Sequence, residues 1–338
     1  MPIRSGKKNL QRWNLLRERY QNRGMVLALG AGLSTGCNIP NWPELLCRMG
    51  QKCLGPQGRE MVNDLIKAGM TLPAIAGILE SKLPKNSRFL DVLSGEIYRE
   101  FPFHDVITQK NGPKLVNFIQ KSNPTMRAVA ALCTRKISPT EFGANENIHA
   151  LVNFNVDSVL RTYAHWRYGA YLYRTIEGVS KLGIHDRIPV YHMHGFLKFY
   201  RSRRPDDDEE VPCVFTEGEY YDFFNRPNSM FNYTFLYLLR EFNCLFIGMS
   251  MTDENIRRLL HYSTAERRQR AREKGGSPER LALRHFCILK RSGSKTRDEL
   301  TDISLRRLGT RVLWINGFDE IPQRLAFIYG EDKWRAVY

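Results

Sequence analysis

The stretch MVLALGAGLSTG, residues 25–36, decides the fold. It begins with five apolar residues and runs directly into a turn that contains three glycines. Further short apolar runs occur along the chain, and most of them have Gly or Asn at or next to their last residue: 148–154, 189–195, 243–249, 285–290 and 311–317. Continuous rather than alternating hydrophobicity indicates strands that are buried on both faces, as in a parallel sheet covered by helices. Because helical stretches separate these runs, the sequence predicts an α/β fold with a doubly wound, mainly parallel, Rossmann-like sheet of six or so strands.

More than a hundred residues separate the first two predicted strands, which is too many for one crossover helix. Amphipathic spacing predicts helices in this interval over 44–54, 57–69, 72–83, 87–99 and 113–136. We therefore expect 44–145 to form a helical insertion module beside the mouth of the site. It would lie within one domain that spans 1–338. The strands 25–29 and 148–153 are still expected to be neighbours in the sheet.

The chain is basic, with 51 Lys and Arg against 35 Asp and Glu in 338 residues, a formal net charge of +16. The excess is concentrated in 1–24 and 254–280, and such surfaces attract nucleic acid, acidic proteins or small polyanions. Nucleic acid is not favoured, because the second segment offers only Tyr262 as an aromatic partner for bases. We expect solvated basic helices, with 262–281 a charged helix that stops at a Gly-Gly pair. The run 201–210 is expected to be an exposed loop.

The basic N-terminal segment, 1–24, also has an apolar side. Leu10, Trp13 and Leu16, followed by Tyr20, have the spacing of one stripe on a helix. An apolar stripe must be covered, so we expect this helix to pack against the body of the protein or against a neighbouring subunit.

The sequence argues against a membrane protein and against a secreted one. No run of 18 apolar residues occurs, and the basic N-terminus has neither an apolar core nor a small-residue cleavage site. The seven cysteines are odd in number and none shows C-x-x-C spacing. This pattern is typical of reduced thiols, and it predicts a cytoplasmic protein without a disulfide framework or a four-cysteine zinc site.

Ligands of open α/β sheets bind beyond the carboxyl ends of the strands, so the residues after each strand are the candidates for a site. The first strand is followed by Gly30, Ala31, Gly32 and Ser34. Glycines let the backbone approach a pyrophosphate, although the same turn could form without a ligand. The third glycine comes one residue late for G-x-G-x-x-G. No acidic residue ends a second strand about 20 residues on, which argues against an ordinary dehydrogenase.

The second and third strands also end in polar residues. Asn155 and Asp157 follow the second strand and can both point into the crevice, although Asp157 could equally cap the next helix. The third strand ends at His194, with His192 two residues earlier. A His-x-His pair can bind a metal, but no third ligand stands at useful spacing. We therefore interpret His194 as an exposed imidazole that can act as a base near neutral pH.

The fourth strand leads into a second glycine and serine turn, with Gly248 and Ser250, and then into a helix. Together the four elements G-A-G-x-S with I-P, N-x-D, H-G and G-x-S-x-x-D, in this order, resemble the Sir2 (sirtuin-like) family. The segments IPNWPELL and FIGMSMTDENIRRLL are more similar to the bacterial Sir2-like NADase domains of antiviral defence than to protein deacylases.

The resemblance implies that NAD binds across the crevice. It places the pyrophosphate near four residues of the first turn: Gly30, Ala31, Gly32 and Ser34. It assigns Asn155 to the nicotinamide ribose and the attacking water, Asp157 to the carboxamide, and His194 to the role of base. Gly248 and Ser250 would lie by the adenosine ribose.

The resemblance predicts an NAD glycohydrolase that releases nicotinamide and ADP-ribose, acting as an NAD-depleting effector of antiphage defence. Control would come from a homo-oligomer or from a separately encoded regulatory or sensor protein. Sirtuin deacylases carry a zinc ribbon with paired C-x-x-C motifs, which this chain lacks, so no zinc is expected. Two alternatives stay open. One is an NAD-dependent deacylase or ADP-ribosyltransferase, and the other is a non-catalytic subunit that senses NAD or ADP-ribose.

Overall fold

The computed structural model describes residues 3–85, 87–103, 111–169, 172–176, 187–197, 213–225, 230–275, 277 and 282–338. Its centre is a sheet of seven strands: β1 (Met25–Leu29), β4 (Ile148–Asn153), β5 (Tyr173–Ile176), β6 (Ile188–His192), β7 (Cys244–Ile247), β8 (His285–Lys290) and β9 (Thr310–Ile315). Their order is β5-β6-β4-β1-β7-β8-β9, and every neighbouring pair is parallel. The protein is therefore an α/β protein with a doubly wound, Rossmann-like sheet, and the predicted pairing of β1 with β4 is confirmed.

Strand β1 occupies the middle of the sheet because all of its side chains are apolar and all five are buried. Leu27 and Leu29 contribute to the core on one face of the sheet. Val26 and Ala28 contribute to the core on the other face. This two-sided burial is what the continuous apolar runs of the sequence predict.

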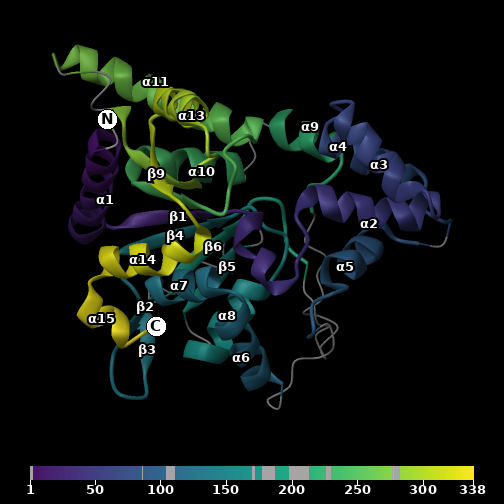
Figure 1. Cartoon of the computed structure of the whole chain (residues 1–338), viewed down its shortest axis with the longest axis horizontal. Helices are drawn as coiled ribbons and strands as arrows, with labels where there is room; N and C mark the ends of the chain where they lie inside the picture. The colour runs from purple at the N-terminus through teal and green to yellow at the C-terminus, as the bar shows by residue number, and fades with distance from the viewer. Residues whose placement is uncertain are drawn as a thin grey trace.

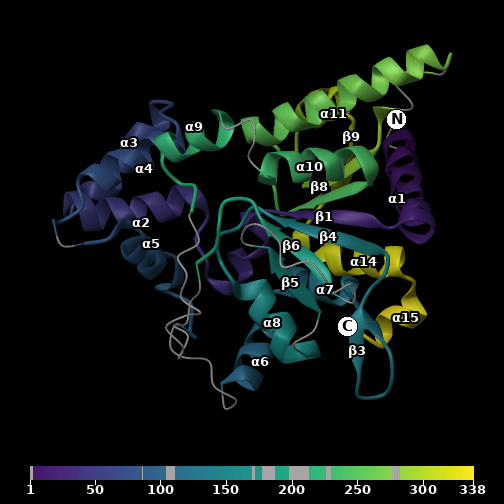
Figure 2. The ribbon, with the colours of Figure 1, turned by 180° about the vertical axis from the view of Figure 1, so that it is seen from behind.

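Helices cover both faces of the sheet (Figures 1 and 2). On one face lie α7 (Pro124–Leu132), α8 (Val159–Tyr168) and α14 (Ile321–Tyr329), with α6 (Gly112–Ser122) and α15 (Glu331–Arg335) further out. On the other face lie α10 (Met230–Glu241), α11 (Glu254–Glu273) and α13 (Lys295–Arg307). A small antiparallel hairpin is formed by β2 (Thr134–Lys136) and β3 (Phe142–Ala144).

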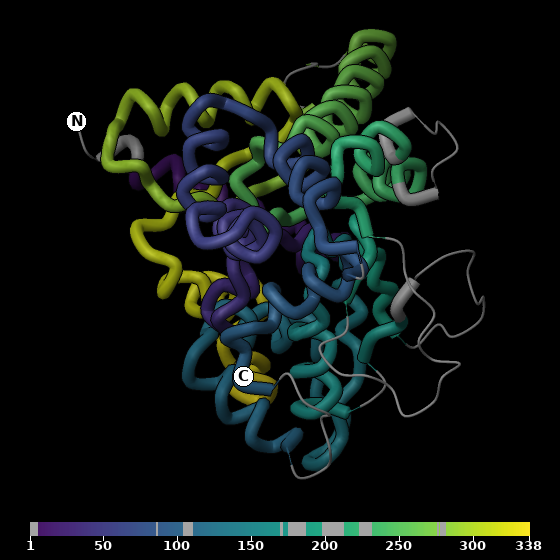
Figure 3. The backbone as a smooth tube through the Cα atoms, turned by 90° about the vertical axis from the view of Figure 1, so that its right-hand side faces the viewer, coloured from purple at the N-terminus to yellow at the C-terminus, as the bar shows by residue number. Residues whose placement is uncertain are grey.

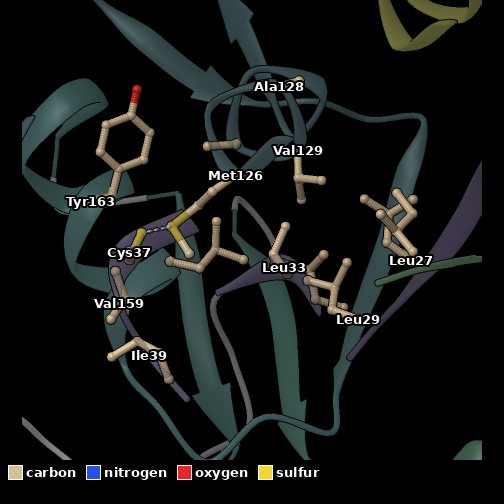
Figure 4. Packing of buried hydrophobic residues seen from close by; sticks show 14 of the residues in the cluster. Leu27, Leu29, Leu33, Cys37, Ile39, Met126, Ala128, Val129, Val159 and Tyr163 are labelled. Atoms are coloured by element: carbon tan, nitrogen blue, oxygen red, sulfur yellow. Dashed lines mark hydrogen bonds between the residues drawn. The ribbon is translucent and has the colours of Figure 1, made fainter. Parts of the chain in front are cut away.

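The core on the first face joins β1 to the turn that follows it (Figure 4). Leu27 and Leu29 of β1 lie beside Leu33 and Cys37, which belong to two short 3₁₀ turns, Ala31–Leu33 and Thr35–Cys37. The Cys37 thiol faces the Met126 sulfur of α7 at 4.0 Å. The buried side chains of Leu33 and Cys37 anchor the turn to the core. The polar atoms of the turn are therefore held at the carboxyl edge of the sheet.

Five helices stand at the end of the molecule where β1 ends: α2 (Trp42–Leu54), α3 (Gly58–Lys67), α4 (Leu72–Ser81), α5 (Phe89–Tyr98) and α9 (Glu217–Asn225). In the side view of Figure 3, α2 to α5 lie in front of the sheet. Helix α2 begins after Asn41, whose side-chain oxygen accepts a hydrogen bond from the Glu44 amide at 3.0 Å. These helices therefore stand beside the edge of the sheet where ligands of this fold class bind.

Two local predictions were wrong, and one strand was not predicted. The segment 113–136 is two helices and a strand instead of one helix. Pro124 cannot donate a helical hydrogen bond, and the Asn123 side chain caps the new helix by accepting from the Met126 amide at 2.9 Å. The helix expected after the Gly248 turn and the expected helix 262–281 form the single helix α11, which ends before Gly275, where φ is +66°. The sheet also includes β5, which the sequence did not signal. The run 201–210 lies outside the described residues.

Helix α1 (Ile3–Arg23) packs against the body of the protein, as its apolar stripe predicts. Trp13, Leu16 and Tyr20 are buried, whereas Leu10 is 52% exposed and is an exception. Asn9 covers the free edge of β9, because its amide donates to the Trp314 carbonyl at 2.8 Å and accepts from the Trp314 amide at 3.0 Å. None of the helices in the described part of the chain has the length and the apolar character needed to cross a membrane.

Candidate functional site

An open pocket of about 560 Å³ lies at the carboxyl ends of β1, β4 and β6. Strand β1 pairs with β4 on one side and with β7 on the other. The chain adds β4, β5 and β6 on one side of β1 and then β7, β8 and β9 on the other, so the direction in which strands are added reverses at β1. Such a reversal opens a crevice at the carboxyl edge of an α/β sheet. Three polar residues named from the sequence line the pocket together: Asn155, Asp157 and His194. Ala31 of the first turn lines it as well.

The glycines after β1 permit close contact with the turn after β7. The Gly30 amide donates to the Ile247 carbonyl at 3.0 Å, and the Gly32 amide donates to the Gly248 carbonyl at 2.9 Å. A Cβ atom on Gly30 would come within 2.7 Å of the Gly248 carbonyl oxygen, and one on Gly248 would come within 2.6 Å of the Leu33 amide nitrogen. The two turns can therefore approach this closely only because these positions are glycine.

Asn155 is a buried polar residue of the pocket whose side-chain nitrogen is hydrogen-bonded and whose side-chain oxygen is not. Its side chain is buried, and its Nδ2 donates to the Gly30 carbonyl at 3.0 Å. Its backbone amide donates to the Asn153 side-chain oxygen at 3.1 Å. Its Oδ1 atom is buried and has no hydrogen-bond partner among the described residues. Because a buried unpaired oxygen is costly, this atom is available to accept from a ligand or a water in the pocket.

Asp157 is both a pocket residue and a helix cap. Its Oδ1 accepts a hydrogen bond from the Val159 amide at 3.1 Å at the start of α8, as in the capping alternative. Burial raises the pKa of Asp157, and a hydrogen bond from the buried Ser34 opposes this rise. Ser34 therefore does not line the pocket. It lies behind the pocket wall and contributes to the site through its hydrogen bond to Asp157.

His194 follows β6 and is half-buried between aromatic rings. Its imidazole lies 5.6 Å from the Phe154 ring and 5.6 Å from the Tyr220 ring, between centroids. Burial lowers the pKa of His194, and the negative charge of Asp253 acts in the opposite direction. The lowered pKa keeps the imidazole neutral near pH 7, which is the state that can accept a proton.

His192 lies behind the site. It is buried, and burial lowers the pKa of its imidazole to about 3, so it stays uncharged. Its Nδ1 is 3.5 Å from the Asn153 side-chain nitrogen, and Asn153 in turn accepts from the Asn155 amide. His192 and Asn153 therefore support Asn155 from within the sheet.

Gly248 and Ser250 do not line this pocket. Gly248 has φ +71° and packs against the first glycine turn. The Ser250 hydroxyl is exposed and lies 2.7 Å from the Thr252 hydroxyl. Asp253 caps α11 by accepting from the Ile256 amide at 2.9 Å.

Sequence reasoning missed the aromatic wall of the pocket. Trp42 stacks on Tyr220 with ring centroids 5.9 Å apart, and Phe215 meets the Trp42 ring edge-on at 6.2 Å. Trp42 and Phe215 both line the pocket. The sequence does contain an aromatic-rich segment, 215–224, which includes Phe215 and Tyr220. However, no local pattern in that segment indicates that it packs against Trp42.

Tyr98 is a second missed residue, and it joins the insertion helices to the site. Its hydroxyl accepts from the Ser158 amide at 3.0 Å and donates to the Leu197 carbonyl. It thereby connects the loops after β4 and β6 to α5. Among the described residues, no group of three or more His, Cys, Asp or Glu side chains is arranged to hold a metal ion.

Comparison with protein-family models gives a match over part of the chain. Residues 149–308 match the family model of the SIR2-like domain, a family whose domains bind NAD. The matched segment includes Asn155, Asp157 and His194, whereas the first glycine turn lies outside it. No curated protein matches the chain. Residues 149–308 are therefore similar to the SIR2-like domain, and the parallel sheet with a polar pocket at its carboxyl edge is consistent with that similarity.

Proposed function

We propose that this protein is an NAD glycohydrolase that hydrolyses NAD to nicotinamide and ADP-ribose. The observation that carries the proposal is the buried, unpartnered Oδ1 of Asn155 in a pocket that it shares with the imidazole of His194. The SIR2-like match supports NAD as the substrate.

The residues present fit the chemistry of this reaction. Breaking the bond between nicotinamide and ribose develops oxocarbenium character at the ribose carbon, as in glycoside hydrolysis. The bonding electrons leave with nicotinamide, a water oxygen bonds to the ribose carbon, and the water gives up a proton. Asn155 Oδ1 would accept a hydrogen bond from that water or from a ribose hydroxyl, and neutral His194 would take the proton. Positioning of this kind supplies much of the rate of such reactions.

The pocket wall suits the nicotinamide end of the substrate. Trp42, Ile97, Phe154 and Phe215 give it an apolar and aromatic lining. An apolar wall excludes bulk water while the fixed polar groups orient the reacting atoms. In this proposal Asp157, whose raised pKa favours the protonated form, faces the carboxamide.

The remainder of NAD would extend along the carboxyl edge of the sheet. The proposal places the pyrophosphate at the first turn: Gly30, Ala31, Gly32 and Ser34. It places the adenosine ribose by Gly248 and Ser250, in the turn that packs against the first one. The two turns are in contact, so a dinucleotide that follows this edge would meet both of them.

We further propose that the enzyme depletes NAD as an effector of antiphage defence and acts in the cytoplasm. A homo-oligomer or a separately encoded regulatory protein would restrain it. The support is the similarity of residues 39–46 and 246–260 to bacterial Sir2-like NADase segments.

The test is direct. Purified full-length protein is incubated with NAD, and nicotinamide and ADP-ribose are followed by chromatography, with and without an acetylated peptide. Nicotinamide release in the absence of peptide, lost in Asn155→Ala and kept in the surface variant Gln51→Ala, is the expected result. Release that requires the peptide would indicate a deacylase instead. Tight NAD binding without any release would indicate a sensing subunit.

A further inference from the structure

A second pocket lies where β8 and β9 end. In the sheet these two strands are on the opposite side of β1 from β4 and β6, whose ends contribute to the pocket that contains Asn155 (the Asn155 pocket). It is open, contains about 660 Å³ of empty space, and shares no lining residue with the Asn155 pocket. Its walls come from α1, from Arg291 after β8, from Asn316 after β9, and from Arg324 of α14. Residues far apart in the chain therefore form this pocket together.

Two guanidinium groups in this pocket are held over indole rings. Arg291 lies over the Trp314 ring at 5.6 Å, and Arg324 lies over the Trp13 ring at 5.4 Å, measured to the ring centroids. Both arginine side chains remain about one third exposed, at 34% and 36%. Stacking on an aromatic face orders a guanidinium before any ligand arrives, which lowers the entropy cost of binding.

Each of the two guanidinium groups forms an ion pair with one carboxylate, through a single nitrogen. Arg291 is 3.5 Å from Asp298, and Arg324 is 3.1 Å from Glu320. The Glu320 carboxylate is itself held by the backbone and side-chain amides of Asn316 at 2.8 and 3.0 Å. A guanidinium has five N–H donors, so donors remain on both arginines after these contacts are made.

A buried donor without a partner provides an independent observation. Trp13 is fully buried and lines the pocket, and its indole Nε1–H has no hydrogen-bond acceptor among the described residues. Buried N–H groups are nearly always paired, so an unpaired one beside a pocket indicates a place for an acceptor atom. This unpaired donor belongs to a residue of the pocket wall, which also carries the two guanidinium groups.

We propose that this pocket binds a small phosphate-bearing ligand. A phosphate group has more acceptor oxygens than a carboxylate and matches guanidinium forks in a bidentate geometry. Arg291 and Arg324 supply the two forks, and Trp13 Nε1–H supplies a third donor. Glu320 in the lining and Asp298 beside Arg291 offset the two positive charges, so the attraction for a phosphate comes from the N–H donors that remain on the two guanidinium groups. The site is separate from the NAD pocket and does not depend on the proposed hydrolysis.

The test uses isothermal titration of the full-length protein with three probes: inorganic phosphate, AMP and adenosine. Phosphate and AMP should bind, and adenosine should not. Arg291→Gln and Arg324→Gln should each weaken AMP binding by roughly 10- to 100-fold, as expected for lost charge-assisted hydrogen bonds. Arg297→Gln is the matched control, since this arginine lies on the neighbouring helix α13 and outside the pocket. It should bind AMP like the wild type.

Two further variants keep the test decisive. Trp13→Phe retains an aromatic ring at this position but removes the indole donor together with part of the buried ring system. In protein that thermal unfolding shows to be folded, AMP binding should fall by several-fold. Asn155→Ala should leave AMP binding at this pocket intact, which separates it from the NAD site. Unchanged AMP affinity in both arginine variants would overturn the proposal, as would an equal loss in Arg297→Gln. Failure of phosphate and AMP to bind at millimolar concentration would also overturn it.

Discussion

The side-chain amide of Asn155 donates to the carbonyl oxygen of Gly30 over 3.0 Å and so joins the turn after β4 to the turn after β1. A carbonyl can only accept, so the amide nitrogen must face Gly30 and the Oδ1 atom must face away from it. The orientation of the Asn155 oxygen is therefore determined by the backbone of another strand. This contact is the basis of the first prediction.

Asn155→Asp is expected to abolish NAD cleavage. An aspartate has the same shape but replaces the donor with a carboxylate oxygen, which would face the Gly30 carbonyl. The side chain would then turn away, and misplacement of this group should lower turnover on the order of 100-fold or more. Nicotinamide release measures the effect. A variant that keeps wild-type turnover would contradict the role of the Asn155 amide.

His194→Ala is expected to lower turnover by roughly 10²- to 10⁴-fold, as for the loss of a general base. The comparison variant is His192→Ala, which removes an imidazole that lies behind the pocket and not in its wall. Thermal denaturation of both variants identifies a temperature at which each is folded. Equal loss of activity in the two variants at that temperature would show that the base is assigned to the wrong histidine.

The pH dependence of turnover should follow the neutral form of His194. Burial lowers the pKa of His194, so the imidazole stays neutral at pH 7 and activity should fall only at a pH below the ordinary histidine pKa of about 6.5. The charge of Asp253 raises the His194 pKa. Asp253→Asn keeps a residue that caps α11 and removes the charge, so the acidic limb should shift to lower pH. A shift to higher pH would contradict this electrostatic link.

Gly248→Ala should destabilise the protein strongly. The change costs about 1–2 kcal/mol for the left-handed backbone, where φ is +71°. In addition its Cβ would clash with the Leu33 amide nitrogen at 2.6 Å. Gly275→Ala is the matched control, because Gly275 has φ +66° with open space around it. Thermal unfolding should show a clearly larger loss for Gly248→Ala, and equal losses would mean that the contact between the turns is unimportant.

Arg12→Ala should cost roughly 3–5 kcal/mol of stability, as for a broken buried ion pair. Arg12 makes two hydrogen bonds to the Asp302 carboxylate, at 2.6 and 2.8 Å, and both side chains are nearly buried. Lys295→Ala is the control, since its pair with Glu299 is exposed and should contribute under about 1 kcal/mol. Chemical denaturation measures both. A loss for Arg12→Ala as small as that for Lys295→Ala would contradict the role of this pair in holding α1.

The sequence by itself determined six of the seven strands of the sheet and the polar residues that follow them. An apolar run such as 25–29 is buried on both faces in any parallel sheet, and a strand-end residue such as Asn155 or His194 reaches the carboxyl edge whatever the strand order is. These properties depend on neighbours in the chain, so they can be inferred from local patterns. The order of the motifs carried the resemblance to the Sir2-like family for the same reason.

Only the tertiary structure decided which atoms of these residues meet. The Asn155 amide is oriented by Gly30, 125 residues earlier in the chain. Gly248 is required as glycine because its turn touches another turn, and Asn9 covers the edge strand at Trp314, 305 residues away. Strand β5, which is not among the apolar runs found in the sequence, is placed in the sheet by its pairing with β6. Contacts between segments so far apart depend on how the whole sheet assembles, and periodicity along the chain holds no information about them.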